Sequence, residues 1–331
     1  MDRQWNVETA IETARSFQPA AVLAAAAELD VFTKLADGPR TVEDLTAELG
    51  ADARAVGILL DALAALRLLE KTADGYTAGA EVARLLSESA PGNLLPAVRH
   101  TANCMRNWAQ LARIVMTGQP APRIPSIRGE QADLEAFIGA MNSFSGPIAD
   151  DVVARLKHLP AAHILDLGGA SGTWTIALLK AFPAARATIV DLPDVIPLAQ
   201  QRIADAGLSD RVAFAAADYL QDPLPRGADF AWLSAILHQH SRPTARRLYE
   251  KVHAALTPGG LLAIRDIVME DSRIEPPAGA LFAVNMLTAT ENGGTYTFAE
   301  YSQDLAAAGF ADITLIHKDP WMNSLITARK A

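Results

Sequence analysis

Apolar residues recur at three- and four-residue spacing through roughly the first ninety positions of this 331-residue chain, where glycine and proline are sparse. This spacing predicts amphipathic helices. The segment Thr41-Val42-Glu43-Asp44 has the composition of a capping box and opens a helix that Gly50 ends. A second helix is expected to start around Ala51-Asp52 and to run to residue 69, followed by a hairpin that turns at Asp74-Gly75. Helix, turn, helix and wing together predict a winged-helix fold.

The helical period continues over residues 90–160, where the proline-rich stretch Met116–Ser126 predicts a loop between two helices. One long helix is expected over residues 133–156. The pattern changes after this helix. We therefore divide the chain into a winged-helix domain (1–92), a bridging helical segment (93–160) and a third domain (161–331).

Short apolar runs alternate with helical stretches from His163 onward; the runs cover residues 164–167, 187–192, 212–218, 228–236 and 261–268. This alternation predicts an α/β fold with a doubly wound, mostly parallel sheet that helices cover on both faces. Pro258-Gly259-Gly260 is expected to form a turn before a strand. Two short strands separated by Asp319-Pro320 are expected to form a terminal hairpin at the sheet edge.

One βαβ unit carries a candidate nucleoside site. The run Ile164–Gly172 (ILDLGGASG) is an apolar strand that ends in a glycine-rich turn, and a helical pattern follows at once. Asp191 ends the next strand, nineteen residues after Gly172. Glycine lets a ligand approach the backbone closely, and a carboxylate at the end of this strand can accept hydrogen bonds from both ribose hydroxyls.

The order of the glycines argues against a dinucleotide. Dinucleotide sites use G-x-G-x-x-G and hold the pyrophosphate against a helix N-terminus. Here the order is Gly168-Gly169-Ala170-Ser171-Gly172, and Asp166 precedes it. An acid at that position suits a cofactor with an ammonium group and no phosphate, so S-adenosylmethionine is the expected ligand. The alternative is an ordinary glycine turn of an α/β protein.

The net charge and the cysteine content indicate which binding partners and which cellular location to expect. The net charge is −9, and residues 1–100 carry 9 basic against 15 acidic side chains, which disfavours nucleic acid and anionic membranes. The winged helix is therefore interpreted as a dimerisation module rather than a DNA reader. Cys104 is the only cysteine, which excludes an intrachain disulfide and favours a cytoplasmic location. No stretch of the chain has the pattern of a secretory signal or a membrane span.

Taken in order, the motifs DLGGASG, IVDLP, AADYL, ILH, PGG and YTFAEY resemble those of the class I S-adenosylmethionine-dependent O-methyltransferases of the two-domain type. Caffeic acid and acetylserotonin O-methyltransferases and many bacterial natural-product methyltransferases form this family. The resemblance implies a homodimer formed through the winged-helix domain, bridging helices that line a substrate pocket, and a Rossmann-like domain that binds S-adenosylmethionine without a metal.

The resemblance also assigns residues to the cofactor. The residues placed around its amino-acid part are Asp166, Gly168, Gly169 and Gly172. Asp191 is placed at the ribose. The residues placed against the adenine are Leu192, Asp218 and Tyr219. Ser234 stands near the cofactor at a position where plant members often have lysine. Asp218 could alternatively be a carboxylate that caps a loop or helix.

His238 matches the catalytic base of the family, and Asp266 the acid that orients it. A phenol with a pKa near 10 is a poor nucleophile at neutral pH, so a base that works near pH 7 is needed. The alternatives are a structural histidine, a strand-end acid paired with Arg265, or a metal pair of His238 with His240 that lacks further ligands. Thr295 and Tyr296 stand where plant members have a second acid.

The substrate pocket is expected to include Trp108, Phe137, Met141, Phe282, Asn285 and Met286. The expected reaction is methylation of a phenolic hydroxyl on a small aromatic metabolite. C- or N-methylation, or cofactor binding without methyl transfer, is the alternative within the same fold. A winged-helix regulator that senses the cofactor is a more remote one. No pattern in the sequence identifies the methyl acceptor.

Overall fold

The computed structural model describes residues 4–331 and contains two compact units. One unit runs through Arg106 and continues over Arg123–Ser143. The other comprises Asn107–Pro122 and Phe144–Ala331. Residues 93–160, expected to be one bridging segment, contribute to both units, and the domain boundaries given above stay predictions.

The first unit is mostly helical and contains a short hairpin. Its elements are α1 (Val7–Arg15), α2 (Phe17–Glu28), α3 (Val31–Lys34), α4 (Val42–Leu49), α5 (Ala53–Ala65), β1 (Glu70–Thr72), β2 (Gly75–Thr77), α6 (Ala80–Leu86), nearly all of α7 (Leu95–Trp108) and most of α9 (Glu130–Ser145). The capping box at Thr41 and Asp44 is confirmed. Strands β1 and β2 pair antiparallel, which confirms the wing. Phe32, Leu45 and Leu60 lie at the centre of the core.

Two helices end earlier than the periodicity predicts. Helix α5 stops at Ala65 because Arg67 adopts a left-handed conformation (φ 60°) and the Leu68 amide donates back to the Leu63 carbonyl. A glycine usually marks such an end, and here none does. The helix expected over 133–156 is broken at Gly146–Ile148, a short 3-10 segment that contains Pro147.

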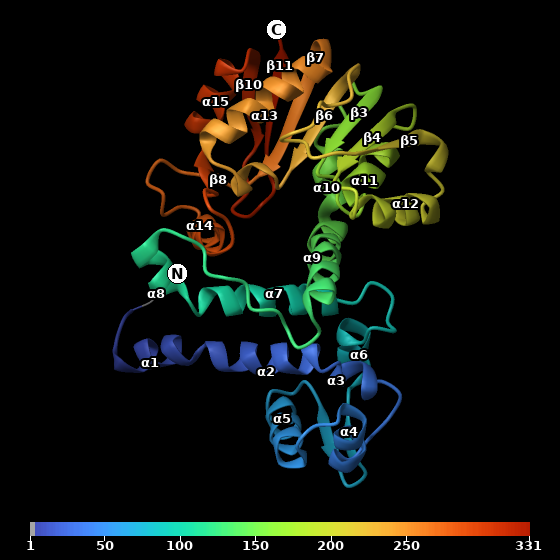
Figure 1. Ribbon diagram of the computed structural model, residues 1–331, viewed down its shortest axis with the longest axis vertical. Coiled ribbons are helices and arrows are strands. Elements are labelled where there is room, and N and C mark those ends of the chain that lie inside the picture. Colours follow the sequence, from blue (N-terminus) through green and yellow to red (C-terminus); the bar gives the residue numbers. More distant parts are fainter. Residues whose placement is uncertain (1–3) are drawn as a thin grey trace. The chain divides into compact units, whose positions relative to one another are not determined.

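The second unit is built on a seven-stranded sheet with the order β10-β11-β7-β6-β3-β4-β5 (Figure 1). The strands are β3 (His163–Leu167), β4 (Arg186–Asp191), β5 (Val212–Ala216), β6 (Ala228–Ser234), β7 (Leu256–Asp266), β10 (Phe310–His317) and β11 (Ser324–Lys330). Strands β3 to β7 are parallel. Their order reverses between β3 and β6. In α/β proteins, ligands bind at the carboxyl ends of the strands where the order reverses.

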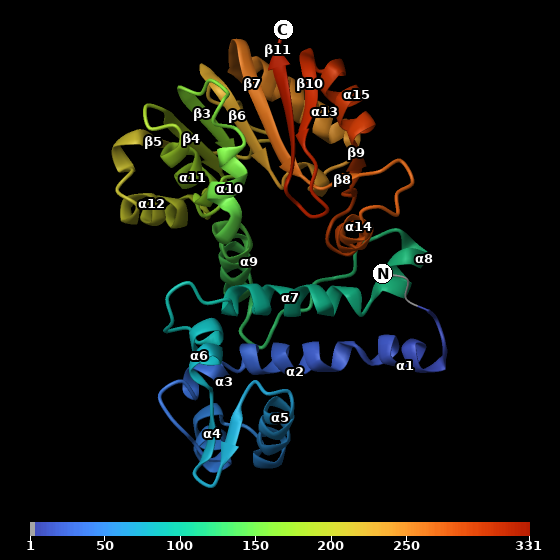
Figure 2. The same cartoon turned by 180° about the vertical axis from the view of Figure 1, so that it is seen from behind.

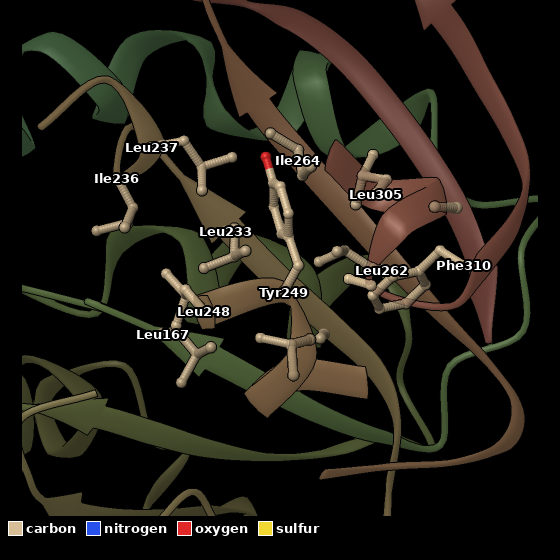
Figure 3. Packing of buried hydrophobic residues seen from close by; sticks show 14 of the residues in the cluster. Leu167, Leu233, Ile236, Leu237, Leu248, Tyr249, Leu262, Ile264, Leu305 and Phe310 are labelled. Atoms are coloured by element: carbon tan, nitrogen blue, oxygen red, sulfur yellow. The ribbon is translucent and has the colours of Figure 1, made fainter. Parts of the chain in front are cut away.

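Helices cover both faces of this sheet, which confirms the predicted α/β fold. One face carries α13 (Arg242–Ala255) and α15 (Phe298–Ala307), and the other carries α10 (Ala149–Ala154), α11 (Thr173–Ala181) and α12 (Ile196–Asp205) (Figures 1 and 2). Tyr249 of α13 lies at the centre of the first layer, among leucines from β6, β7 and α15 (Figure 3). These layers hold the strand ends rigidly in place.

Two features of the sheet concern the chain's last third. The terminal hairpin is confirmed, because β10 and β11 pair antiparallel and β11 pairs with β7 at the sheet edge. The prediction of a turn at Pro258-Gly259-Gly260 is wrong. These residues lie inside β7, where the register against β6 slips between Ala228 and Phe230, so the extra residues form a bulge. Gly259 adopts φ +74°, which a bulge allows and a regular strand does not.

The remaining elements of this unit are α8 (Leu111–Thr117), α14 (Pro277–Ala289), β8 (Val268–Met269) and β9 (Tyr296–Thr297). Strands β8 and β9 form a small parallel pair. Over residues 4–331, no helix is both long and apolar enough to cross a membrane.

Candidate active site

The candidate residues gather at one edge of the sheet. Asp191, Ser234 and Asp266 are the last residues of β4, β6 and β7, and Asp218 follows two positions after β5. Because these strands are parallel, their carboxyl ends lie at the same edge. The glycine turn that follows β3 lies in the middle of this row.

The glycine turn packs too tightly for side chains. Gly168 has φ +66°, and a Cβ there would collide with Ile236. A Cβ on Gly169 would lie 2.8 Å from Ile189 Cγ2 and 3.2 Å from Asp166 Oδ2. Gly172 also has a positive φ and opens α11. The glycines therefore bring the turn against β4 and keep its backbone free of side chains beside the strand ends.

Asp191 is tied to this turn. Its Oδ2 accepts from the Ala170 amide at 2.7 Å and its Oδ1 from the Leu192 amide at 2.8 Å. Burial raises the pKa of this carboxyl, and the two amides oppose that shift. Each oxygen keeps a further lone pair, which suits a vicinal diol as donor. Leu192 beside it is 50% exposed, an uncovered apolar side chain that could pack on a flat ring.

Asp166 lies beneath the turn rather than on its surface. It is almost completely buried and accepts from Thr175 Oγ1 at 2.5 Å. Burial raises its pKa to about 7, and the nearby Asp191 adds to the shift. A nearby positive charge would favour its ionised form. The acid pair formed by Asp166 and Asp191 therefore suits a cationic ligand and disfavours a phosphate.

Asp218 and Tyr219 form the end of the row beyond β5. Asp218 Oδ1 accepts from the Leu220 amide at 2.8 Å, so it caps its own turn, as the alternative interpretation held. The Tyr219 hydroxyl and His240 Nε2 share a hydrogen bond of 3.1 Å. A Cβ on Gly168 would lie 3.7 Å from the Tyr219 ring, so this ring borders the glycine turn.

His238 and Asp266 form a buried pair. His238 follows β6 in a short 3-10 segment, and its Nδ1 lies 2.8 Å from Asp266 Oδ1. The two residues are only 5% and 1% exposed. Asp266 also accepts from the Ile267 amide at 2.8 Å, which fixes the carboxylate. Because Nδ1 donates to Asp266, Nε2 carries the lone pair, and no hydrogen bond to Nε2 is found among residues 4–331.

This pairing answers one of the alternatives. Successive side chains of a strand point to opposite faces, so Arg265 and Asp266 diverge. Asp266 turns to His238, whereas Arg265 donates to Ser234 Oγ and Asn323 Oδ1. Asp266 is not a surface acid paired with Arg265. It has the position of an acid that orients a histidine.

Three of the predicted pocket residues share one face of α14. The Phe282 ring packs edge-on against the His238 ring, with centroids 4.8 Å apart. Asn285 Oδ1 accepts from Trp108 Nε1 at 2.9 Å, and Met286 is buried one position further on. The structure therefore brings Phe282 to His238 and links Trp108 to Asn285.

Phe137 and Met141 belong to α9 in the other unit. Phe137 is 42% exposed and packs edge-on against His100, with ring centroids 5.2 Å apart. The assignment of both residues to the substrate pocket stays a prediction.

The second acid of the plant pattern has no counterpart beside His238 among the described residues. The Tyr296 hydroxyl donates to the His240 carbonyl, and Glu291 is exposed. The His238 carbonyl accepts from the Gly294 amide at 2.8 Å, so this loop supports the histidine through its backbone. Asp266 is the one carboxylate that forms a hydrogen bond with His238 within residues 4–331.

Two contributors were missed from the sequence. Thr175, in the first turn of α11, reaches back to Asp166, and no local pattern marks this contact. The sequence suggests Arg265 only as a partner of Asp266. The period-two alternation of β7 could have shown that it faces away from that acid.

The side chains that could bind a metal ion do not form a metal site within the described part of the chain. No cluster of three or more His, Cys, Asp or Glu side chains suited to hold a metal ion occurs in residues 4–331. His240 turns to Tyr219 rather than towards a shared ion with His238.

A doubly wound sheet, a glycine turn bonded to a strand-end acid and a buried histidine–acid pair are the features of a class I methyltransferase. The family model of the O-methyltransferase domain matches residues 123–311, and that of the O-methyltransferase dimerisation domain matches residues 11–89. The chain belongs to this O-methyltransferase family, whose members use S-adenosylmethionine.

Individual relatives agree along nearly the whole chain. The tetracenomycin polyketide synthesis 8-O-methyl transferase TcmO of Streptomyces glaucescens is 34% identical over 92% of this chain and 91% of its own length. The 3-hydroxy-5-methyl-1-naphthoate 3-O-methyltransferase of Streptomyces sahachiroi is 33% identical, over 93% and 91%. The N,N-dimethyltransferase OxyT of Streptomyces rimosus is 28% identical, over 91% and 89%. Human N-acetylserotonin methyltransferase, solved with S-adenosylmethionine, superposes with a TM-score of 0.81 at 26% identity over both full chains.

Proposed function

We propose that this protein transfers a methyl group from S-adenosylmethionine to a phenolic hydroxyl of a small fused-ring aromatic metabolite, with His238 as general base. The observation that carries the proposal is the buried hydrogen bond of 2.8 Å between His238 Nδ1 and Asp266 Oδ1. The acceptor class is supported by the two Streptomyces relatives, whose names state O-methylation of a polyketide and of a hydroxynaphthoate.

S-adenosylmethionine supplies, when bound, a methyl group that its positive sulfur already activates. Asp191 would hold the ribose, Leu192 and Tyr219 would border the adenine, and Asp166 with the glycine turn would lie at the amino-acid part. The paired acids at Asp166 and Asp191 fit a cationic ligand.

His238 acts on the acceptor. Its Nε2 lone pair takes the hydroxyl proton, and the phenolic oxygen gains nucleophilic character. Asp266 keeps the imidazole in the tautomer that leaves Nε2 free and stabilises the imidazolium that forms. Phe282 packs on the ring edge and limits its rotation. No residue in this scheme requires a metal, so methyl transfer should persist in EDTA.

The assignment of the base is tested with His238→Gln. Loss of a general base slows transfer by about 10²- to 10⁴-fold. Transfer of labelled methyl to hydroxynaphthoates is measured, and binding of S-adenosylhomocysteine is followed by calorimetry. We expect transfer to fall while the affinity for S-adenosylhomocysteine stays unchanged. Full transfer by this variant would refute the role of His238.

Asp266→Asn tests the positioning role. The amide oxygen can still accept from Nδ1, so the geometry is kept and only the negative charge is lost. We expect a slower reaction and an acid limb of the kcat profile displaced to lower pH, because the imidazolium loses its counter-charge. A purely structural role would change protein stability and leave the pH profile in place.

N-methylation is the second candidate, because the relative OxyT is named as an N,N-dimethyltransferase. A matched pair of acceptors, 3-hydroxy-2-naphthoate and 3-amino-2-naphthoate, separates the two. Methylation of the hydroxy compound alone supports the O-methyltransferase, and methylation of the amine alone supports the alternative.

We further propose a homodimer formed through the N-terminal domain, supported by the matching dimerisation model and by exposed apolar side chains on α1 and α2. A cytoplasmic location is proposed from the single cysteine, Cys104.

A further inference from the structure

Arg265, the penultimate residue of β7, is a buried cation. Only 4% of the residue is exposed. Its Nε and Nη2 donate to Asn323 Oδ1 at 3.0 and 2.8 Å, and its Nη1 donates to Ser234 Oγ at 3.2 Å. The guanidinium carbon lies 4.5 Å from the centre of the Trp174 ring. The planar group is thus held firmly by neutral partners.

No carboxylate neutralises this charge in the described chain. Arg265 forms no ion pair among residues 4–331. Asp266 is directed to His238, and Asp319 is the other acid near enough to act electrostatically. Burial lowers the pKa of Arg265 to about 10, and these two acids oppose the shift without cancelling it. A buried charge without a counter-ion is costly, so it is expected to have a ligand of opposite charge.

The guanidinium of Arg265 also has N–H groups that donate no hydrogen bond among residues 4–331. Each terminal nitrogen of a guanidinium carries a pair of N–H groups, and each terminal nitrogen of Arg265 makes one hydrogen bond. One N–H on each terminal nitrogen is therefore uncommitted. Such a fork matches the two oxygens of a carboxylate.

The position of Arg265 in the row of strand ends indicates which carboxylate of a ligand its free N–H groups would bind. Under the proposed function the adenine lies by Asp218 after β5, and the ribose by Asp191 at the end of β4. In the sheet order the next strands are β3, β6 and β7. The amino-acid end of the cofactor must therefore extend towards β6 and β7, where Ser234 and Arg265 pair in register.

We propose that Arg265 binds the carboxylate of the methionine part of S-adenosylmethionine and so supplies, from β7, the positive charge that this carboxylate needs. Trp174, the second residue of α11 after the glycine turn, holds the guanidinium plane beside that turn. The inference rests on the proposed function, since it assumes this cofactor at this edge of the sheet.

The test compares two ligands that differ only in the carboxylate: S-adenosylhomocysteine and 5′-deoxy-5′-(3-aminopropylthio)adenosine. The wild type should bind the first at least about 10-fold more tightly, in keeping with a charge-assisted hydrogen bond. Equal affinities for the two would overturn the assignment while leaving the cofactor site intact. Binding of neither ligand would instead refute the proposed function.

Variants localise the effect. Arg265→Gln should weaken S-adenosylhomocysteine by about 10- to 100-fold and leave the decarboxylated ligand within about threefold. Arg186→Gln, which removes an exposed cation at the opposite end of β4, is the matched control and should bind both ligands like wild type. Equal weakening of both ligands by Arg265→Gln would mean a structural role and would overturn the proposal.

Two further variants keep the test valid if Arg265→Gln folds poorly. Arg265→Lys retains the charge and should retain most of the preference for S-adenosylhomocysteine. Ser234→Lys combined with Arg265→Gln returns a cation to the in-register position on β6. Recovery of the preference in this double variant would establish that charge, rather than folding, carries the effect.

Discussion

Arg265 and Asp266 show how a single strand separates two functions at the residue scale. They are neighbours in the chain, yet the pleat sends their side chains to opposite faces. Asp266 meets His238 and fixes its tautomer, whereas Arg265 meets Ser234, Asn323 and the Trp174 ring. The proposed base and the proposed partner of the cofactor carboxylate are therefore positioned by two adjacent residues of β7.

Asp166 gives a prediction about pH and stability. Its pKa is about 7 in the folded protein and near 4 when unfolded, so the native state holds this proton more tightly. Native stability is therefore lost as pH rises from about 4 to 7. Asp166→Asn keeps an acceptor for Thr175 and cannot ionise. Its free energy of unfolding relative to wild type should rise between pH 5 and pH 8, by on the order of 1–4 kcal/mol.

The measurement is urea unfolding of both proteins, without ligand, at pH 5 and pH 8. Asp194→Asn, which removes an exposed carboxylate, is the control and should run parallel to wild type because that group is solvated in both states. If the difference between Asp166→Asn and wild type were the same at both pH values, the buried acid would not titrate as described.

At the scale of elements, boundaries depend on residues that carry no local signal. Periodicity located α5 correctly but extended it to residue 69, because the left-handed residue that ends it is arginine rather than glycine. The break at Pro147 has a recognisable cause, since proline disrupts a helix interior. The sequence predicts a turn at Gly259 because the bulge in β7 depends on pairing with β6, which the segment itself does not encode.

Arg67→Gly tests the end of α5. A side chain in the left-handed region costs free energy that glycine avoids, so the variant should be more stable by about 0.5–1 kcal/mol. Arg54→Gly makes the same exchange within the first turn of the same helix and should destabilise the protein, because glycine is a poor helix former. Thermal unfolding of the two variants should therefore shift in opposite directions. A loss of stability in Arg67→Gly would contradict this view of the helix end.

At the scale of the whole molecule, the N-terminal unit has apolar side chains with no cover. Val7 and Ile11 lie one turn apart on α1, with exposed fractions of 78% and 47%, and α1 buries no residue. Phe17, at the start of α2, is also exposed. Contiguous exposed apolar side chains mark association surfaces. In a chain with a dimerisation domain, a second copy is the expected partner.

Ile11→Asp should therefore shift the protein from dimer to monomer, because a charge would be buried without a partner in the interface. Light scattering after size exclusion gives the mass directly. Ile274→Asp is the matched control, since Ile274 is also exposed but lies outside the dimerisation match, and this variant should leave the dimer intact. A dimeric Ile11→Asp variant would place the interface elsewhere.

The amino-acid sequence alone determined the parallel α/β sheet, the winged helix, the glycine turn with Asp191 and the pairing of His238 with an acid. The sheet, the winged helix and the glycine turn follow from local periodicity and from glycine and proline, which short segments encode. The pairing of His238 with Asp266 is implied by the family resemblance, which the order of the motifs carries.

Only the tertiary structure decided which groups meet across the sheet. Thr175 beneath Asp166, Phe282 against His238, and Arg265 beside Ser234 and Trp174 depend on strand register and on the pleat. A shift of one residue in the register would exchange every inward and outward side chain, and no local pattern carries that information.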